Sequence, residues 1–201
     1  MSSARVFVSI SVPYNNLCRR EGAETVKTWL IGTACFVVGL IVFPLAALLY
    51  LDYGRPPVVV GDSSFPFERQ ITGALLHRRM AAEMTQAPIR ATDQSLQEGA
   101  VTYKEQCAFC HGLPNHAAEV GKNMFPSAPQ LWATHRNGVV GVSDDPVGET
   151  FWRVKNGIRL TGMPSYKNTL TESQMWEVSQ LLASAAGPLP GSVRAALEST
   201  K

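Results

Sequence analysis

A single run of apolar residues divides this chain into parts that fold in different surroundings. From Trp29 to Leu51 there are 23 consecutive residues without a charge, WLIGTACFVVGLIVFPLAALLYL. A helix of about 20 such residues is long enough to cross the hydrocarbon core of a bilayer. A buried helix of a soluble protein seldom continues so far without a charge, and the apolar core of a signal peptide is shorter, roughly 7–15 residues. The run therefore predicts an uncleaved transmembrane anchor over residues 28–51.

The basic residues around this run predict its orientation. Four of them precede the run, and two fall within about 20 residues after it. They are Arg5, Arg19, Arg20 and Lys27 before it, and Arg55 and Arg69 after it. Because basic flanks tend to stay in the cytoplasm, residues 1–27 are expected to form a cytoplasmic tail. The rest of the chain is expected to be exported, as in a single-pass protein of the bacterial inner (plasma) membrane with a periplasmic domain.

The segment after the anchor is interpreted as a connector. Prolines and glycines interrupt its first part, which is expected to be extended. Apolar residues then recur at helical spacing and predict an amphipathic helix over about 68–85. The connector is therefore expected to cover residues 52–91 and to include one helix, which either packs on the exported domain or lies at the membrane surface.

Three helices with recognisable ends are expected after the connector. They begin near Thr92, Asp145 and Thr171, which are residue types that cap helix N-termini. Asp145 is expected to be the N-cap of the second helix, with Pro146 at its first position. In the third helix, Gln174 is placed to complete a capping box with Thr171.

No alternation typical of strands competes with these helices, so the fold class is expected to be all-α. Three main helices joined by long loops are expected over residues 92–187, followed by a C-terminal tail over 188–201. A domain of about 95 residues with three short helices has a thin core, because small domains bury proportionately less surface. Something besides side chains is expected to fill its middle.

The sequence EQCAFCHGLP contains the residues with the most distinctive chemistry. Cys107 and Cys110 are three residues apart, so one helical turn places both sulfurs on one side, and His111 follows directly. A zinc site would need further ligands in a paired spacing, which the chain does not offer. Those ligands would have to come from His77, His116 or His135. A redox-active dithiol would begin a helix after a strand, whereas this pair ends a helix.

The pattern Cys-x-x-Cys-His is the signature of covalent c-type haem attachment. In that arrangement the thiols of Cys107 and Cys110 bond to the two vinyl groups of one porphyrin, and His111 ligates the iron. A large flat apolar group would also supply the missing core. We therefore favour haem over zinc and over a dithiol.

Three methionines could supply a sixth iron ligand in the exported part. Met175 lies inside the third helix at core spacing and is expected to pack. Met124 lies 13 residues after His111 and offers a short route to the opposite haem face. Met163 is favoured, because Gly162 and Pro164 flank it with a rigid bend that can present one side chain to a metal.

Residues from about 92 to 187 resemble a class I monohaem cytochrome c domain. The matching features are Gly99 and Tyr103 ahead of Cys107-Ala108-Phe109-Cys110-His111-Gly112, the stretch Ala128-Pro129-Gln130-Leu131, the run from Asn156-Gly157-Ile158-Arg159 to Gly162-Met163-Pro164, and a last helix with Trp176. The resemblance implies that the first and last helices cross at Gly99, near Trp176. It also implies that the backbone carbonyl of Pro129 accepts a hydrogen bond from the axial histidine.

This resemblance implies one covalent haem c, bound through Cys107 and Cys110, with His111 and Met163 as axial iron ligands. Several further side chains are candidates for haem packing or for hydrogen bonds to the haem propionates. They are Trp152, Arg159 and Tyr166, and also Trp132 and Arg153.

The expected function is that of a membrane-tethered one-electron carrier that transforms no substrate and passes electrons between redox partner proteins. It would act as a free carrier or as a subunit of a respiratory or photosynthetic complex. With a formal net charge of +2, the chain gives no indication of a nucleic-acid partner. The alternatives are a haem-based sensor or small-ligand-binding protein with a labile sixth site, and a haem enzyme using His116 or His135 as a distal acid or base.

Overall fold

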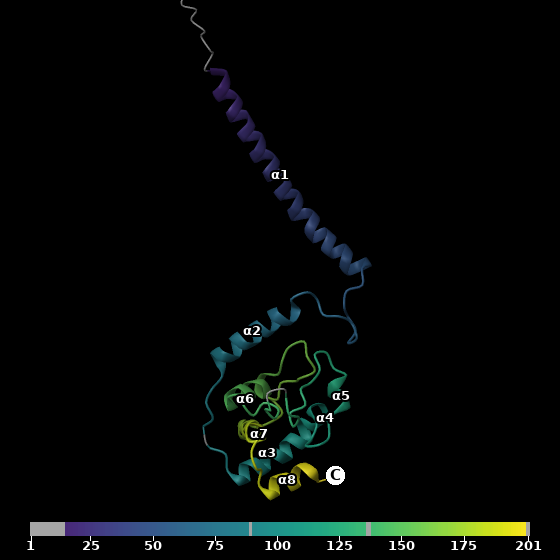
Figure 1. Cartoon of the computed structure of the whole chain (residues 1–201), viewed down its shortest axis with the longest axis vertical. Coiled ribbons are helices and arrows are strands. Elements are labelled where there is room, and N and C mark those ends of the chain that lie inside the picture. The colour runs from purple at the N-terminus through teal and green to yellow at the C-terminus, as the bar shows by residue number, and fades with distance from the viewer. Residues whose placement is uncertain (1–14, 89, 136–137, 200–201) are drawn as a thin grey trace, which may run out of the picture. The chain divides into compact units, whose positions relative to one another are not determined.

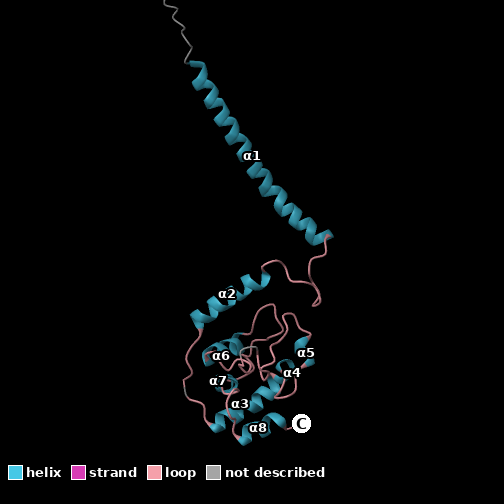
Figure 2. Cartoon of the chain, viewed as in Figure 1, coloured by secondary structure: helices cyan, strands magenta, loops and turns pink. Residues whose placement is uncertain are grey.

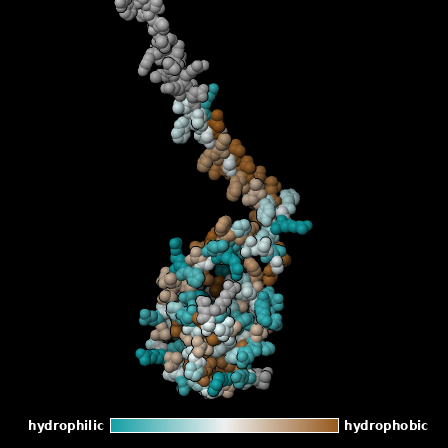
Figure 3. Space-filling model, in the orientation of Figure 1, coloured by the Kyte–Doolittle hydropathy of each residue, from teal (hydrophilic) through white to brown (hydrophobic). Residues whose placement is uncertain are grey.

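The computed structural model describes residues 15–88, 90–135 and 138–199, and the chain divides into two compact units, Met1–Pro57 and Val58–Lys201. The first unit contains helix α1 (Asn15–Tyr53), and its segment Thr25–Tyr53 is long and apolar enough to cross a membrane. None of its most apolar stretch is buried, and Figure 3 shows this stretch as a brown band between paler ends. The expected anchor therefore lies within α1. The helix starts earlier than residue 28, because it continues from the polar segment before the apolar run.

The second unit consists of helices and loops, and no strand occurs among its described residues (Figures 1 and 2). Its helices are α2 (Glu68–Glu83), α3 (Asp93–Gln106), α4 (Ala108–His111), α5 (Glu119–Lys122), α6 (Val147–Asn156), α7 (Glu172–Ala183) and α8 (Gly191–Glu198). The expected all-α fold class is confirmed, with α3, α6 and α7 as the three main helices expected over residues 92–187.

Two of the three N-caps predicted from the sequence are present in the structure. Thr92 and Ser95 form a capping box at the start of α3, and Thr171 and Gln174 form one at the start of α7. The prediction for α6 was wrong, because Pro146 is its N-cap and no side chain caps it. The Asp145 carboxylate instead accepts a hydrogen bond from Arg153, with 2.9 Å between Nη1 and Oδ2.

The core forms where α7 packs against α3 and α6. A methyl group added at Gly99 of α3 would collide with the backbone carbonyl of Glu177 in α7. Only glycine therefore allows these two backbones to approach so closely. The crossing lies one residue from Trp176, whose ring stacks on Phe151 of α6 with centroids 3.8 Å apart.

The expected C-terminal tail is instead part of this core. Helix α8 packs against α3, and its side chains Val193 and Leu197 are almost completely buried. The Lys104 ammonium of α3 donates to the backbone carbonyls of Ala196 and Ser199, which lie at the end of α8. The helix is only eight residues long and is stabilised by this long-range packing, which its own sequence does not reveal.

The expected connector also differs from the structure. Its helix α2 ends at Glu83, two residues earlier than predicted, and packs against α6. Met80 is buried there, and the indole Nε1–H of Trp152 donates to Glu83 at 3.0 Å. Gly148 of α6 lies directly against the carbonyl oxygen of Thr85. From Val58 onward, the connector is therefore part of the second unit.

Candidate functional site

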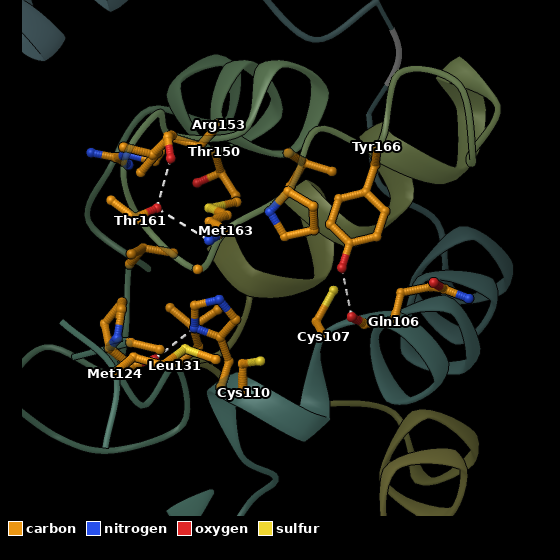
Figure 4. Close-up of a pocket in the computed structure, with 18 of the residues that line it drawn as sticks. Gln106, Cys107, Cys110, Met124, Leu131, Thr150, Arg153, Thr161, Met163 and Tyr166 are labelled. Atoms are coloured by element: carbon orange, nitrogen blue, oxygen red, sulfur yellow. Dashed lines mark hydrogen bonds between the residues drawn. The ribbon is translucent and has the colours of Figure 1, made fainter. Parts of the chain in front are cut away.

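One cavity of about 290 Å³ lies between the helices and the loops of the second unit (Figure 4). Most of its lining atoms are apolar, and they come from five parts of the chain. These are the α3–α4 junction, the loop 124–131, Val142, helix α6 with the loop 158–166, and the α7 side chains Val178 and Leu182. The cavity brings together residues that are up to 76 positions apart, from 106 to 182.

The α3–α4 junction places both thiols and the imidazole at this cavity. Cys107 ends α3, and the next helical turn closes when the backbone amide of His111 donates to the carbonyl of Cys107 at 2.9 Å. Cys107, Cys110 and His111 all line the cavity. Gly112 then turns the chain away with φ of +75°, where a side chain would collide with Gln130 and with the carbonyl of His116.

The His111 ring has a fixed tautomer. Its Nδ1 lies 2.8 Å from the backbone carbonyl oxygen of Pro129, and a carbonyl only accepts, so Nδ1 bears the hydrogen. Burial lowers the pKa of His111, although the hydrogen bond to Pro129 partly opposes this shift. The ring is therefore held neutral, which leaves the lone pair of Nε2 available to a metal.

The thiol of Cys107 lacks the electrostatics of a redox-active or zinc-binding cysteine. Burial and the neighbouring Cys110 raise the pKa of Cys107 to about 12, whereas reactive and metal-binding cysteines have lowered values. Among the described residues, no group of three or more His, Cys, Asp or Glu side chains is arranged to hold a metal ion. His116 and His135 are also absent from the cavity lining.

The loop that carries Met163 is braced by its own backbone. The amide of Ile158 donates to the carbonyl of Met163 at 3.2 Å, and the amide of Met163 donates to the hydroxyl of Thr161 at 3.1 Å. The Thr161 hydroxyl in turn donates to the carbonyl of Ile158 at 2.7 Å. Gly157 begins this loop with φ of +65°. This tight turn presents Met163 at the cavity (Figure 4).

Two of the three methionines, Met124 and Met163, line the cavity, and the third is packed in the core. Met175 is buried in the cluster of Phe151 and Trp176, where the sequence predicted packing. Met124 lines the cavity together with Met163, and its sulfur lies where a side chain at Gly162 would be. Sequence reasoning left the position of Met124 open, because the path of the loop after His111 depends on long-range contacts.

The peripheral candidates divide into two groups. Tyr166 lines the cavity, and its hydroxyl donates to the carbonyl of Gln106 at 2.7 Å, which joins the Met163 loop to the end of α3 (Figure 4). Arg153 also lines the cavity and is paired with Asp145 and Glu149. Trp152 and Arg159 are outside the lining: Trp152 turns to α2, and Arg159 is exposed.

Trp132 is half-buried and lies outside the cavity lining, with its ring edge-on to Tyr103 at 5.7 Å between centroids. Gln130 was not predicted as a functional residue. Its side chain accepts from the amide of Ala118 at 2.7 Å and donates to the carbonyl of Cys110 at 3.3 Å, which anchors the loop after His111. Its place between Pro129 and Leu131 was the only signal in the sequence.

These features fit a porphyrin. The cavity is apolar, two thiols and the imidazole of His111 line it, and a braced loop presents a thioether. In a comparison with protein families, residues 94–182 match the model described as cytochrome c oxidase, cbb3-type, subunit III. A comparison with curated proteins gave no match. Residues 94–182 are therefore a c-type cytochrome domain, a haem-based carrier of electrons.

Proposed function

We propose that this protein is a membrane-tethered one-electron carrier with one covalently bound haem c, ligated axially by His111 and Met163. The observation that supports it best is that both thiols, a neutral imidazole and the Met163 loop line a single apolar cavity. Haem supplies a single iron that cycles between the Fe(III) and Fe(II) states and so takes up and releases one electron at a time.

Cys107 and Cys110 attach the cofactor in this proposal. Each S–H would add across one vinyl group of the porphyrin, so that a sulfur–carbon bond would form and the hydrogen would go to the other vinyl carbon. This addition would consume no oxidant or reductant.

His111 and Met163 keep the site rigid. The hydrogen bond to Pro129 fixes the ring plane of His111 and increases its basicity as a ligand. The hydrogen bonds of the loop from Ile158 to Met163 hold the thioether without a helix behind it. A site whose ligands do not move between oxidation states has a low barrier to electron transfer.

The surroundings of the domain suggest where it works. We place α1 across the bacterial inner membrane, with the N-terminus in the cytoplasm and the haem domain in the periplasm. The matching family model describes an oxidase subunit, which favours partners within a respiratory membrane complex over a freely ranging carrier. The electron would enter from one redox protein and leave to the next component of that complex.

The test is the haem content of the full-length protein made with haem-attachment machinery. We expect one haem that stays bound after denaturation, and a potentiometric titration that fits a single one-electron step. Cys107→Ser should lose the double attachment, whereas Cys35→Ser, a thiol in α1, should retain it. Haem that dissociates on denaturation of the unmodified protein would contradict covalent attachment.

A further inference from the structure

The haem-domain unit is connected to α1 by a very short linker. The connector is fixed to the domain by the burial of Met80, by the bond from Trp152 to Glu83, and by the contact of Gly148 with Thr85. Only residues 54–57 lie between the end of α1 and Val58, and such a segment spans at most about 18 Å when fully extended. The length of the linker therefore limits how far Val58 can lie from the end of α1.

The residues next to this linker are held in a turn. The Asp62 carboxylate accepts hydrogen bonds from the amides of Val58 and Val59 at 2.8 and 3.0 Å. The Glu68 carboxylate accepts from the amide of Phe65 at 2.8 Å. Val60 also lines a shallow cleft together with the loop 122–127 of the same unit. The valines are thus presented on a folded segment rather than on a free coil.

An exposed apolar stripe continues from this turn along α2. Phe67 lies directly before α2, Ile71 and Leu75 lie one turn apart within it, and each of the three has more than half of its surface exposed. At 100° per residue, Ile71 and Leu75 lie on the opposite side of the helix from the buried Met80. We call Val58–Val60 with Phe67, Ile71 and Leu75 the apolar stripe.

Charges around the stripe suit a bilayer surface. Arg78 lies one turn beyond Leu75 on the same side of α2 and is exposed. The two acidic residues of α2 are both engaged elsewhere, because Glu83 accepts from Trp152 and Glu68 caps the amide of Phe65. An apolar face with a basic residue beside it is typical of helices that lie in the interface of a membrane.

We propose that the apolar stripe lies in the surface of the same bilayer that α1 crosses, and that it fixes the haem domain against the membrane. This inference rests on the proposed anchor, because the short linker brings the stripe to the bilayer only if α1 spans it. If α1 spans the bilayer, the short linker keeps the apolar stripe within reach of lipid. The haem domain then moves laterally with the membrane instead of ranging into the periplasm.

The test uses the full-length haem protein in nanodiscs of phosphatidylcholine and phosphatidylglycerol. Benzoylphenylalanine, a photo-crosslinking residue, replaces Leu75 in the stripe, Val101 on the exposed side of α3, or Leu40 within α1. Mass spectrometry then measures phospholipid adducts after illumination. All three positions are solvent-exposed in the structure, so the substitutions preserve the fold, and an unchanged haem spectrum verifies this for each sample.

We expect adduct yields at Leu75 that approach those at Leu40 and exceed those at Val101 several-fold. High yields at Leu40 with equal, low yields at Leu75 and Val101 would overturn the surface contact and leave the anchor intact. Low yields at Leu40 as well would overturn the anchor, and this inference with it.

Discussion

The two sides of helix α7 are built in different ways. On one side, α3 packs against it and α8 packs in turn on α3, and Tyr103, Leu181 and Val193 have no exposed surface. On the other side, loops surround a cavity of about 290 Å³. We call these the packed side and the cavity side. The packed side is completed by its own side chains, whereas the cavity side has the shape and chemistry of a receptacle for haem.

This difference implies that the two sides depend on haem to different degrees. The packed side is stabilised by burial of apolar side chains, which needs no cofactor. The loops of the cavity side are held mainly by turn hydrogen bonds, such as those between Ile158, Thr161 and Met163. Each such bond contributes only about 1 kcal/mol. We expect haem to supply most of the cohesion of that side.

Removal of haem should produce the largest effect and separates the two sides most clearly. In the Cys107→Ser/Cys110→Ser double variant, amides of the loop 158–166 should lose most of their protection from hydrogen exchange. Amides in the middle of α3 and α7 should stay protected. Hydrogen-exchange mass spectrometry of the variant beside the unmodified haem protein measures both. Uniform loss of protection would show that the sides do not differ.

Leu181→Ala should cause the next largest change, on the packed side. The side chain is completely buried, and its truncation leaves a cavity, so we expect a loss of about 4 kcal/mol in the free energy of unfolding. Leu160→Ala is the matched control, because Leu160 is 86% exposed and should change stability by less than about 0.5 kcal/mol. Denaturant titration of the haem proteins measures both, and similar effects would contradict the packing.

Gly99→Ala tests the crossing of α3 and α7. The added methyl group meets backbone, which cannot rotate away, so the helices must separate. We expect a loss of about 2–3 kcal/mol in the free energy of unfolding. Gly73→Ala in α2 is the control, because a methyl group there meets nothing, and alanine favours a helix. An unchanged midpoint for Gly99→Ala would mean that the helices cross elsewhere.

Tyr166→Phe is a smaller change on the cavity side. It removes the hydrogen bond from the Tyr166 hydroxyl to the carbonyl of Gln106, which should cost about 1 kcal/mol. Because this bond joins the Met163 loop to α3, the variant should also bind added imidazole more tightly than the unmodified protein. Optical titration measures this affinity, and an unchanged affinity would show that the bond does not restrain Met163.

The smallest expected effect is that of pH on the attachment of α2. Hydrogen bonds from Trp152 and then Arg79 lower the pKa of Glu83 below its ordinary value of 4.5. The unfolded state therefore binds this proton more tightly, so the contribution of Glu83 is present above about pH 4.5 and is lost as the pH falls through the folded value. The indole N–H resonance of Trp152 should shift over this range. The same shift in Glu83→Gln would contradict the assignment.

Local features of the sequence predicted the helices and the residues of the attachment motif. The capping boxes at Thr92 and Thr171 involve residues three positions apart, and so does the spacing of Cys107 and Cys110. Such patterns depend only on helical geometry and are therefore visible in one dimension.

Predictions from the sequence were wrong where contacts between distant segments determine the structure. Helix α8 has only eight residues, which is too short for a stable isolated helix, and it is stabilised by its contact with α3. Trp152 was a candidate for the haem, but it turns to Glu83 of α2, 69 positions earlier. Asp145 is a residue type that often caps helices, but its carboxylate pairs with Arg153 instead. In each case a long-range partner outweighed a local preference.

The most direct test of the central claim is the absorption spectrum of the oxidised haem protein, observed at the long-wavelength sulfur-to-iron charge-transfer band. We predict that the band is present, is lost in Met163→Ala, and is retained in Met124→Leu and Met175→Leu. Met124 shares the cavity with Met163 and Met175 packs in the core, so both are matched controls. A band that survives in Met163→Ala, or that disappears in Met124→Leu instead, would contradict ligation by Met163.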